Sequence, residues 1–161
     1  RYLLYETGSE VLLSKEFEFI SSYFDLMKIR YSDQVKISLD LPVDIQNRKV
    51  HPLLFISFIE NAFKYGISYE QASFVKVRFE LNNNFLEARI VNTIHDQATL
   101  SSRTRSGTGT EGDSTMVSIG GIGQENARKQ LNNLYGDNYT LTISEKDETY
   151  FVYLKIPVNY A

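Results

Sequence analysis

The chain of 161 residues contains no cysteine and only two histidines. Without cysteine there is no disulfide framework, no thiolate metal site and no cysteine nucleophile, and this composition fits a reducing compartment. The two histidines, His51 and His95, have no acidic partners at ligand spacing, so we expect no zinc site. No Ser-His-Asp arrangement is identifiable from spacing either. Chemistry based on thiols, zinc or a serine triad is therefore not expected.

Long apolar runs and a strong charge of one sign are also missing. No apolar run approaches the roughly 20 residues that a membrane-spanning helix needs. Residues 1–5 resemble neither a signal peptide nor an initiator methionine, so we expect the chain to be part of a longer protein. A formal charge of -3 and a pI near 5.4 give no general attraction for nucleic acid or anionic lipid. Any anion site must be local, and no nucleic acid partner is expected.

The composition that remains is that of one soluble domain. Hydrophobic residues make up 42% of the chain and aromatic residues 13%, which is ample for a single core. After Ser14, a candidate N-cap, apolar residues recur at steps of three and four and predict a helix that ends near Arg30. A second helix is expected between Pro52, in its first turn, and Gly66, at its C′ position.

Alternating apolar residues predict the strands. Residues 35–41 favour a half-buried strand stopped by Pro42, and residues 75–90 and 139–156 favour two hairpins. Helices and strands in this order predict an α/β fold, a two-layer α/β sandwich with a mixed β-sheet and helices on one face.

Residues 60–66 (Glu-Asn-Ala-Phe-Lys-Tyr-Gly) gather a carboxylate, an amide and a cation on one predicted helix. Asn61 and Lys64 lie about one step apart around that helix. An amide oxygen suits a hard cation such as Mg²⁺, and an ammonium suits phosphate. The pattern predicts a nucleotide site in which Asn61 binds the metal, Lys64 binds phosphate and Tyr65 lines the cleft. The alternative is a set of ordinary exposed helical residues.

Residues 120–128 (Gly-Gly-Ile-Gly-Gln-Glu-Asn-Ala-Arg) open a third predicted helix. Glycines such as Gly121 and Gly123 let backbone N–H groups approach an anion, and the helix that follows offers its positive N-terminal end. Asn126 is expected to contact phosphate, or else to cap the helix, and Arg128 adds a positive charge. A glycine run alone is weak evidence.

The two motifs, in this order and about sixty residues apart, resemble the N-box and the last G-box of the GHKL ATP-binding superfamily, which has the Bergerat fold. The nearest likeness is to the catalytic domain of LytS/YehU-type sensor histidine kinases. Those domains read Pro-Leu-Leu before Glu-Asn-Ala-x-Lys-His-Gly, and later Gly-Gly-Ile-Gly through Leu-Tyr-Gly; residues 52–66 and 120–136 correspond. Residues 13–20 and 28–31 resemble the preceding helix, so the resemblance covers nearly the whole chain.

The resemblance implies a domain organisation and an activity. Residues 1–33 would form the helix leading from a dimerisation and phosphoacceptor region, and residues 34–161 the ATP-binding catalytic domain. This domain would transfer the γ-phosphoryl group of Mg-ATP to a histidine outside the chain, for onward transfer to a response regulator. The full-length protein would be a homodimer, and this domain would be the cytoplasmic part of an inner-membrane sensor.

The stretch before the second motif is rich in serine, threonine and glycine. Residues 99–118 contain no aromatic residue and cannot bury themselves. Such a composition indicates either a disordered surface insertion or a mobile lid. Because the stretch ends directly at the glycine motif, we favour a flexible ATP lid over about residues 95–119, which the resemblance also implies.

The resemblance also implies roles and marks departures. Glu60 would orient or deprotonate the attacking group. The usual Asp-Gly-x-Gly box is absent, and Asn92, reached by following the strand alternation, would read the adenine amino group through its side-chain oxygen, more weakly than Asp does. The alternative for Asn92 is a turn-forming role. Gln124 replaces a common Leu and Gln130 a common Arg, which leaves Arg128 as the guanidinium of that helix.

Two other functions are weighed against the kinase. A noncatalytic nucleotide-binding or protein-interaction module would explain the altered adenine box and Gln130. Another GHKL ATPase is disfavoured because the chain lacks their transducer domain and because residues 134–136 read Leu-Tyr-Gly, as in the kinases. His51 precedes Pro52 but lacks the Pro-His-Phe context of a phosphoacceptor, so we assign it a structural role at the helix start.

Overall fold

The computed structural model describes residues 10–31, 35–45, 47–95 and 121–160. It describes the side chains of all of these except residues 121–124. In chain order, the elements are β1 (Val11–Leu12), α1 (Leu13–Arg30), β2 (Val35–Asp40), β3 (Arg48–Val50), α2 (Ile56–Gly66), β4 (Ser73–Asn82), β5 (Phe85–Thr93), α4 (Gly121–Tyr135), β6 (Thr140–Lys146), β7 (Thr149–Pro157) and β8 (Asn159–Tyr160).

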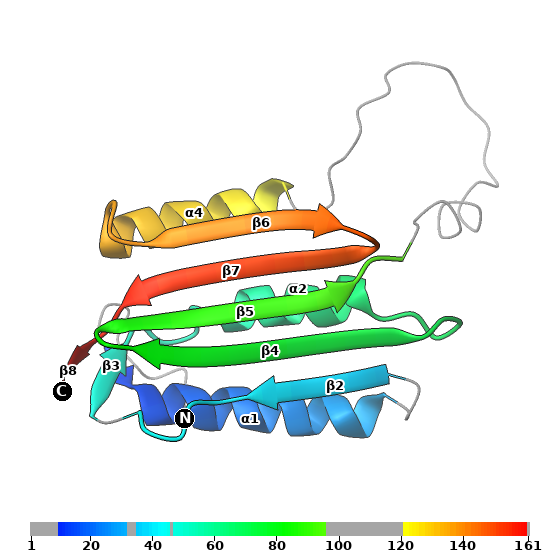
Figure 1. Ribbon diagram of the computed structural model, residues 1–161, viewed down its shortest axis with the longest axis horizontal. Helices are drawn as coiled ribbons and strands as arrows, with labels where there is room; N and C mark the ends of the chain where they lie inside the picture. Colours follow the sequence, from blue (N-terminus) through cyan, green and yellow to red (C-terminus); the bar gives the residue numbers. More distant parts are fainter. Residues whose placement is uncertain (1–9, 32–34, 46, 96–120, 161) are drawn as a thin grey trace, which may run out of the picture.

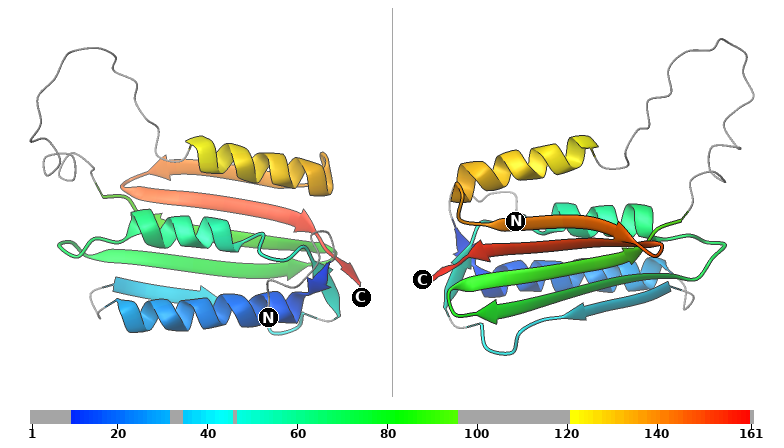
Figure 2. Two further views of the ribbon diagram at one scale, coloured as in Figure 1. Left: turned by 180° about the vertical axis from the view of Figure 1, so that it is seen from behind. Right: turned by 45° about the horizontal axis from the view of Figure 1, so that its top comes forward.

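The main sheet has the strand order β2-β4-β5-β7-β6, with β2 parallel to β4 and the other neighbours antiparallel. The helices α1, α2 and α4 lie side by side across one face of it (Figure 1; Figure 2, left). This arrangement confirms the predicted α/β sandwich with a mixed sheet. A small sheet of β1, β3 and β8 at one end was not predicted, because strands of two or three residues show no alternation.

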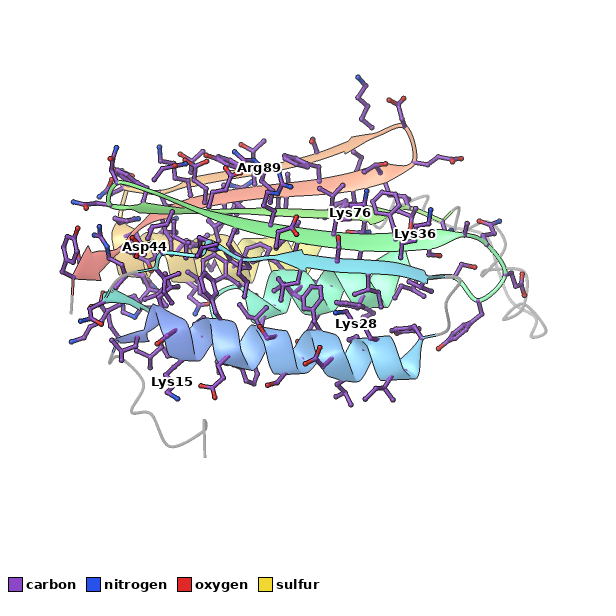
Figure 3. The ribbon with its side chains drawn as sticks, turned by 60° about the horizontal axis from the view of Figure 1, so that its bottom comes forward. Lys15, Lys28, Lys36, Asp44, Lys76 and Arg89 are labelled. Carbon is purple, nitrogen blue, oxygen red and sulfur yellow. The ribbon has the colours of Figure 1, made fainter. Side chains whose placement is uncertain are left out.

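The core lies between the helices and the sheet. Alternate residues of β4, β5 and β7 point toward the helices and are buried. The ring of Phe79 on β4 lies 5.0 Å from both Phe17 of α1 and Phe55, which precedes α2. No helix covers the opposite face of the sheet, where the charged residues Lys36, Lys76 and Arg89 stand away from α1 (Figure 3). One face of the sheet therefore holds the core and the helices.

Both predicted hairpins are confirmed, and their turns use left-handed backbone. Asn83 lies between β4 and β5 with φ 54°, and Asp147 and Glu148 between β6 and β7 have φ 50° and 57°. Positive φ at the turn matches the right-handed twist of the flanking strands. Asn and Asp tolerate this conformation better than most residues do.

The structure corrects the predicted start of both N-terminal helices. α1 begins at Leu13, and its N-cap is Leu12, without a side-chain cap bond, rather than Ser14. α2 begins at Ile56, so Pro52 is not in its first turn. Leu53, with φ 60°, interrupts the helical path, and its N–H donates to Oε2 of the buried Glu16 at 3.1 Å. A long-range hydrogen bond thus fixes a segment that local sequence reads as helical.

Gly66 is also not at the predicted C′ position. It is the last residue of α2, and Ile67 continues in extended backbone with φ -116°. The left-handed glycine is Gly136, after α4, whose φ is 57° and whose N–H donates to the Asn132 carbonyl at 2.9 Å. Gly66 is therefore not explained by a left-handed turn.

Among the described residues, no helix combines the length and the apolar character needed to cross a membrane. The predicted lid lies outside the described residues except for His95, its first residue.

Candidate functional site

Most of the predicted site residues come from α2. This helix buries Phe58, Ile59, Ala62, Phe63 and Gly66 against the sheet, which leaves its polar residues on the outer side. Because 3.6 residues complete a turn, the exposed residues divide between the two flanks of the helix. One flank faces α4 and the other faces α1, with the sheet beneath both (Figure 2, left).

A cavity of about 310 Å³ lies between α2 and α4 and is closed below by β6 and β7. It is lined by Ser57, Phe58, Glu60, Asn61, Asn126, Ala127, Gln130, Ile143, Tyr150 and Val152. The two helices supply the carboxylate and the amides, and the strands supply an apolar and aromatic base. We call this space the α2–α4 cavity.

The α2–α4 cavity brings together three of the predicted site residues. Glu60 and Asn61 from α2 meet Asn126 from α4, although Asn61 and Asn126 are 65 positions apart in the sequence. Gln130, one turn beyond Asn126, lines the same space. It is a neutral amide.

Other predicted residues lie outside this cavity. Arg128 is exposed on α4, and it follows Asn126 by two residues, which places it about 200° around the helix. Lys64 lines a separate cavity between α1 and α2, and its ammonium lies 5.0 Å from the centre of the Tyr65 ring. Tyr65 itself is exposed. The structure therefore separates the two predicted cations from the amides.

Gly121 and Gly123 occupy the first turn of α4. The N-terminal turn of a helix carries free backbone N–H groups and a partial positive charge. This end of α4 follows the predicted lid in the chain, and Asn126 lies in the next turn.

Asn92 lies beneath the C-terminal end of α2. Its side chain is 3% exposed, and its Nδ2 donates to the Thr93 carbonyl at 2.7 Å. A Cβ built on Gly66 would lie 2.6 Å from the Asn92 Cβ, closer than real atoms approach. The Thr93 hydroxyl donates to the Gly66 carbonyl at 2.5 Å. Residue 66 therefore has no room for a side chain. The close approach of Asn92 and the hydrogen bond from Thr93 place the end of α2 directly against β5.

Asn92 does not itself line the α2–α4 cavity, but its cross-strand neighbour does. Asn92 on β5 pairs with Tyr150 on β7, so both side chains point to the helix-covered face. Tyr150 is half-buried in the cavity base. The adenine contact of Asn92 stays a prediction.

Sequence reasoning missed the base of the cavity. The alternation of β6 and β7 could have placed Ile143, Tyr150 and Val152 on the helix-facing side. Their position next to α2 depends on β7 pairing with β5, which no local pattern specifies. Ser57 and Phe58 lie just before the motif, on the same helix, and carried no signal of their own.

The two histidines lie outside both cavities. The ring of His51 packs edge-on against Tyr135 at 5.8 Å. His95 places Nε2 3.0 Å from the Ser73 hydroxyl and Nδ1 3.0 Å from the Gln71 side-chain oxygen. These contacts tie the end of β5 to the start of β4.

Solved structures of histidine kinases have a similar fold. The catalytic domain of histidine kinase ThkA matches with a TM-score of 0.57 and 12% identity over 92% of this chain and 94% of that one. The histidine kinase domain of the Erythrobacter litoralis EL346 blue-light activated kinase matches with a TM-score of 0.57 and 15% identity, over 94% and 64%. The chain has the fold of a histidine kinase catalytic domain.

A third match is full-length ShkA in complex with AMPPNP, with a TM-score of 0.61 and 13% identity. The match covers 95% of this chain and 32% of ShkA, so the chain spans about a third of that protein. No protein-family model matches the sequence. No curated protein matches it either. Identities of this size show a shared fold, and the chemistry has to be argued from the residues.

Proposed function

We propose that this chain is the catalytic ATP-binding domain of a sensor histidine kinase of the LytS/YehU type. It would deliver the γ-phosphoryl group of ATP to a histidine outside the chain, for onward transfer to a response regulator. The observation that carries the proposal is the α2–α4 cavity, where Glu60 and Asn61 meet Asn126 within a histidine kinase catalytic fold. Residues 1–33 would connect it to a dimerisation region, and a homodimeric inner-membrane sensor would carry it on the cytoplasmic side.

The residues of the cavity fit a nucleotide. Its volume lies at the lower end of the range of small-molecule pockets, about 300–1,000 Å³. Phe58, Ile143 and Val152 offer apolar surface for a planar base, and the amides of Asn126 and Gln130 offer donors to ribose and phosphate oxygens. Among the lining side chains that the structure describes, the hydrogen-bond donors are all uncharged. Backbone N–H groups at Gly121 and Gly123 would add contacts to the phosphates.

Asn61 fits a magnesium ion. Mg²⁺ takes oxygen ligands and is commonly held by one or two protein groups, with substrate phosphates and water completing the octahedron. Within the described part of the chain, no group of three His, Cys, Asp or Glu residues forms another metal site. When bound, the metal would neutralise phosphate charge, and Glu60 beside it would orient or deprotonate the attacking group.

A second candidate is the noncatalytic nucleotide-binding or interaction module. Three observations favour it: Gln130 is neutral, Arg128 lies off the cavity, and the Asn92 amide is engaged with the Thr93 carbonyl. Each would weaken binding to ATP. The two candidates differ in whether ATP binds with Mg²⁺ and whether phosphate is transferred.

Calorimetric titration with ATP, with and without Mg²⁺, tests the proposal. The kinase assignment expects metal-dependent binding between micromolar and millimolar Kd, about 4 to 8 kcal/mol. Absence of binding at millimolar ATP by the folded chain would instead support the noncatalytic module. Binding without phosphate transfer by a longer protein that carries the phosphoacceptor histidine would also support that module.

A further inference from the structure

A second cavity, of about 320 Å³, lies on the other flank of α2, between that helix and the C-terminal half of α1. Except for Glu60, none of its lining residues lines the space proposed for the nucleotide. Most of the lining is apolar or aromatic and comes from Tyr23, Met27, Tyr31, Phe63, Ile67 and Tyr69. We call this space the α1–α2 cavity.

Large apolar side chains stand exposed beside this cavity. Leu26 and Ile29, near the C-terminal end of α1, are 57% and 84% exposed. Tyr69, which follows α2 and lines the cavity, is 76% exposed. We call the cavity together with Leu26 and Ile29 the α1–α2 surface. Apolar side chains exposed around a hollow are typical of a surface that binds another protein.

α1 carries apolar residues on two sides, and the described structure covers one of them. Its buried residues recur at the helical period and pack toward the sheet. Tyr23, Leu26 and Ile29 follow one another at steps of three, so they form a second row on the side of α1 that is not buried. In Figure 2 (left), α1 and α2 lie in front of the sheet, and no described element lies in front of them. A helix that is apolar on both sides is typical of one that packs between two partners.

Contacts between aromatic rings hold the floor of the α1–α2 surface in place. The Phe63 ring meets Tyr23 nearly edge-on at 5.7 Å and stacks on Tyr31 at 6.3 Å, and Tyr31 lies 6.1 Å from Tyr69. Because neighbouring rings already fix these side chains, a partner would lose little affinity in ordering them. Tyrosine and arginine are also the residue types that often dominate the binding energy of interfaces.

The charges on the α1–α2 surface specify the chemistry of the partner. Arg30 from α1 and Lys64 from α2 are exposed, and neither forms an ion pair within the described part of the chain. Their cations lie beside rings instead, 5.5 Å from the Tyr31 centre and 5.0 Å from the Tyr65 centre. Glu60 is the one carboxylate among the lining residues. A partner that brings carboxylates to this rim would therefore complement its charge.

The described helices of a second copy do not supply such a partner. The exposed carboxylates on α1 and α4 are already paired with a lysine three or four residues away on the same helix. These pairs are Lys15–Glu18, Asp25–Lys28 and Glu125–Lys129. Two α1–α2 surfaces that faced each other would also bring together the cations of both copies, and like charges oppose such an association.

We propose that the α1–α2 surface docks an amphipathic helix of another protein, whose apolar face is flanked by carboxylates. Its apolar residues, three or four positions apart, lie over Tyr23, Leu26 and Tyr69, as in other complexes of a helix in a groove. Its carboxylates pair with Arg30 and Lys64. The docking does not require ATP, because the α2–α4 cavity lies on the opposite flank of α2.

Titration of the isotope-labelled chain with a synthetic peptide, followed by NMR, tests this docking. The probe is a peptide of about 18 residues, five helical turns, with Leu at helical spacing and Glu on both flanks of the apolar face. A peptide of the same composition in scrambled order is the control for general attraction. We expect saturable binding of the ordered peptide, with amide shifts concentrated in residues 23–31 and 60–69, and binding of the scrambled peptide weaker by about tenfold or more.

Substitutions on the α1–α2 surface separate its apolar and charged parts. The double variant Leu26→Gln/Ile29→Gln should weaken binding of the ordered peptide on the order of tenfold, as the loss of an interface anchor does. Arg30→Gln should weaken it by up to about fivefold, the contribution of an exposed ion pair, and make binding less sensitive to salt. Val43→Gln, a fully exposed apolar residue elsewhere, and Lys28→Gln, an equal charge loss on α1, are the matched controls and should leave binding unchanged.

Equal binding of the ordered and scrambled peptides would overturn the docking site, and so would the absence of shifts in these residues at millimolar peptide. Sedimentation equilibrium of the chain alone examines the other occupant. A dimer that Leu26→Gln/Ile29→Gln dissociates would assign the surface to a second copy and overturn the partner proposed above. Urea midpoints equal to that of the wild type would show that the variants lose binding and not folding. No ATP is present in these measurements, so failure of the docking and failure of the proposed function are distinguishable.

Discussion

At the scale of single residues, Gly66 shows why a motif glycine can be indispensable without a left-handed backbone. The glycine ends α2 where Asn92 rises from β5, and no Cβ fits between them. We predict that Gly66→Ala destabilises the protein by about 1–3 kcal/mol, the usual cost of overpacking, measured by urea unfolding.

A double-mutant cycle identifies the cause of this loss. Asn92→Gly removes the atoms that would clash, so Gly66→Ala should cost less in that background than in the wild type. An equal cost in both backgrounds would place the effect elsewhere. Gly136→Ala is the comparison for backbone strain alone, since φ is 57° there and nothing lies within 4 Å.

Asn61 can be tested at the same scale. Its side chain is exposed on α2 and lines the α2–α4 cavity, where it is proposed to bind Mg²⁺. Asn61→Ala should weaken ATP binding on the order of tenfold in the presence of Mg²⁺, the loss of one good ligand contact. Titration without the metal is the control and should not distinguish the variant from the wild type. Unchanged affinity with Mg²⁺ would remove Asn61 from the metal site.

At the scale of elements, one buried carboxylate links α1 to the segment before α2 by a hydrogen bond. Glu16 is fully buried, and its Oε2 accepts the hydrogen bond from Leu53 N–H. Glu16→Ala would leave that N–H without its acceptor, so we predict a loss of about 1–3 kcal/mol in the free energy of unfolding. Glu16→Gln retains a carbonyl oxygen and should cost less. Faster amide exchange at Leu53 in the Ala variant, with the Phe79 amide on β4 still protected, would locate the effect.

The same element shows how far sequence could predict the fold. Helical and alternating periodicity located α1, α2, β2 and both hairpins, because each buries one regular face. The predicted start of α2 was wrong, because the hydrogen bond between Leu53 and Glu16 joins residues 37 positions apart and leaves no local signal in the sequence. The short strands β1, β3 and β8 were missed because pairing with one another, rather than their own pattern, makes them strands.

At the scale of the whole molecule, the candidate site is where chain-distant elements converge. The two motifs predicted that α2 and α4 would face one nucleotide, and the structure brings Glu60, Asn61 and Asn126 together. Sequence spacing also placed Lys64 with Asn61, whereas the packing of α1 beside α2 turns Lys64 into a different cavity. The helices that pack beside α2 decide which of its residues line which cavity. A motif on α2 alone could not predict this division.

On the face of the sheet that no helix covers, oppositely charged side chains of neighbouring strands form ion pairs. Arg89 on β5 pairs with Glu80 of β4 at 2.6 Å and with Glu87 at 3.2 Å, and Arg89 stands on this face in Figure 3. Burial raises the pKa of Glu87, but hydrogen bonds from Asn82 and Tyr153 and the charges of Arg89 and Lys155 outweigh it, so the pKa is lowered. The ionised carboxylate is therefore the form that the folded sheet favours.

A lowered pKa in the folded state fixes the sign of the pH dependence. Unfolding releases Glu87 to its ordinary pKa of about 4.3, so the unfolded chain binds more protons, and the stability contributed by Glu87 is lost as pH falls from about 5 through the folded pKa. We predict that Glu87→Gln, compared with wild type in urea unfolding from pH 7 to pH 3, shows a smaller loss of stability on acidification. Glu18→Gln is the matched control, because its exposed pair with Lys15 should contribute little. If the Glu87 and Glu18 variants follow the same curve, the Glu87 carboxylate does not contribute to the pH dependence of the sheet's stability, and its contacts with Asn82 and Arg89 are no stronger in effect than an exposed surface pair.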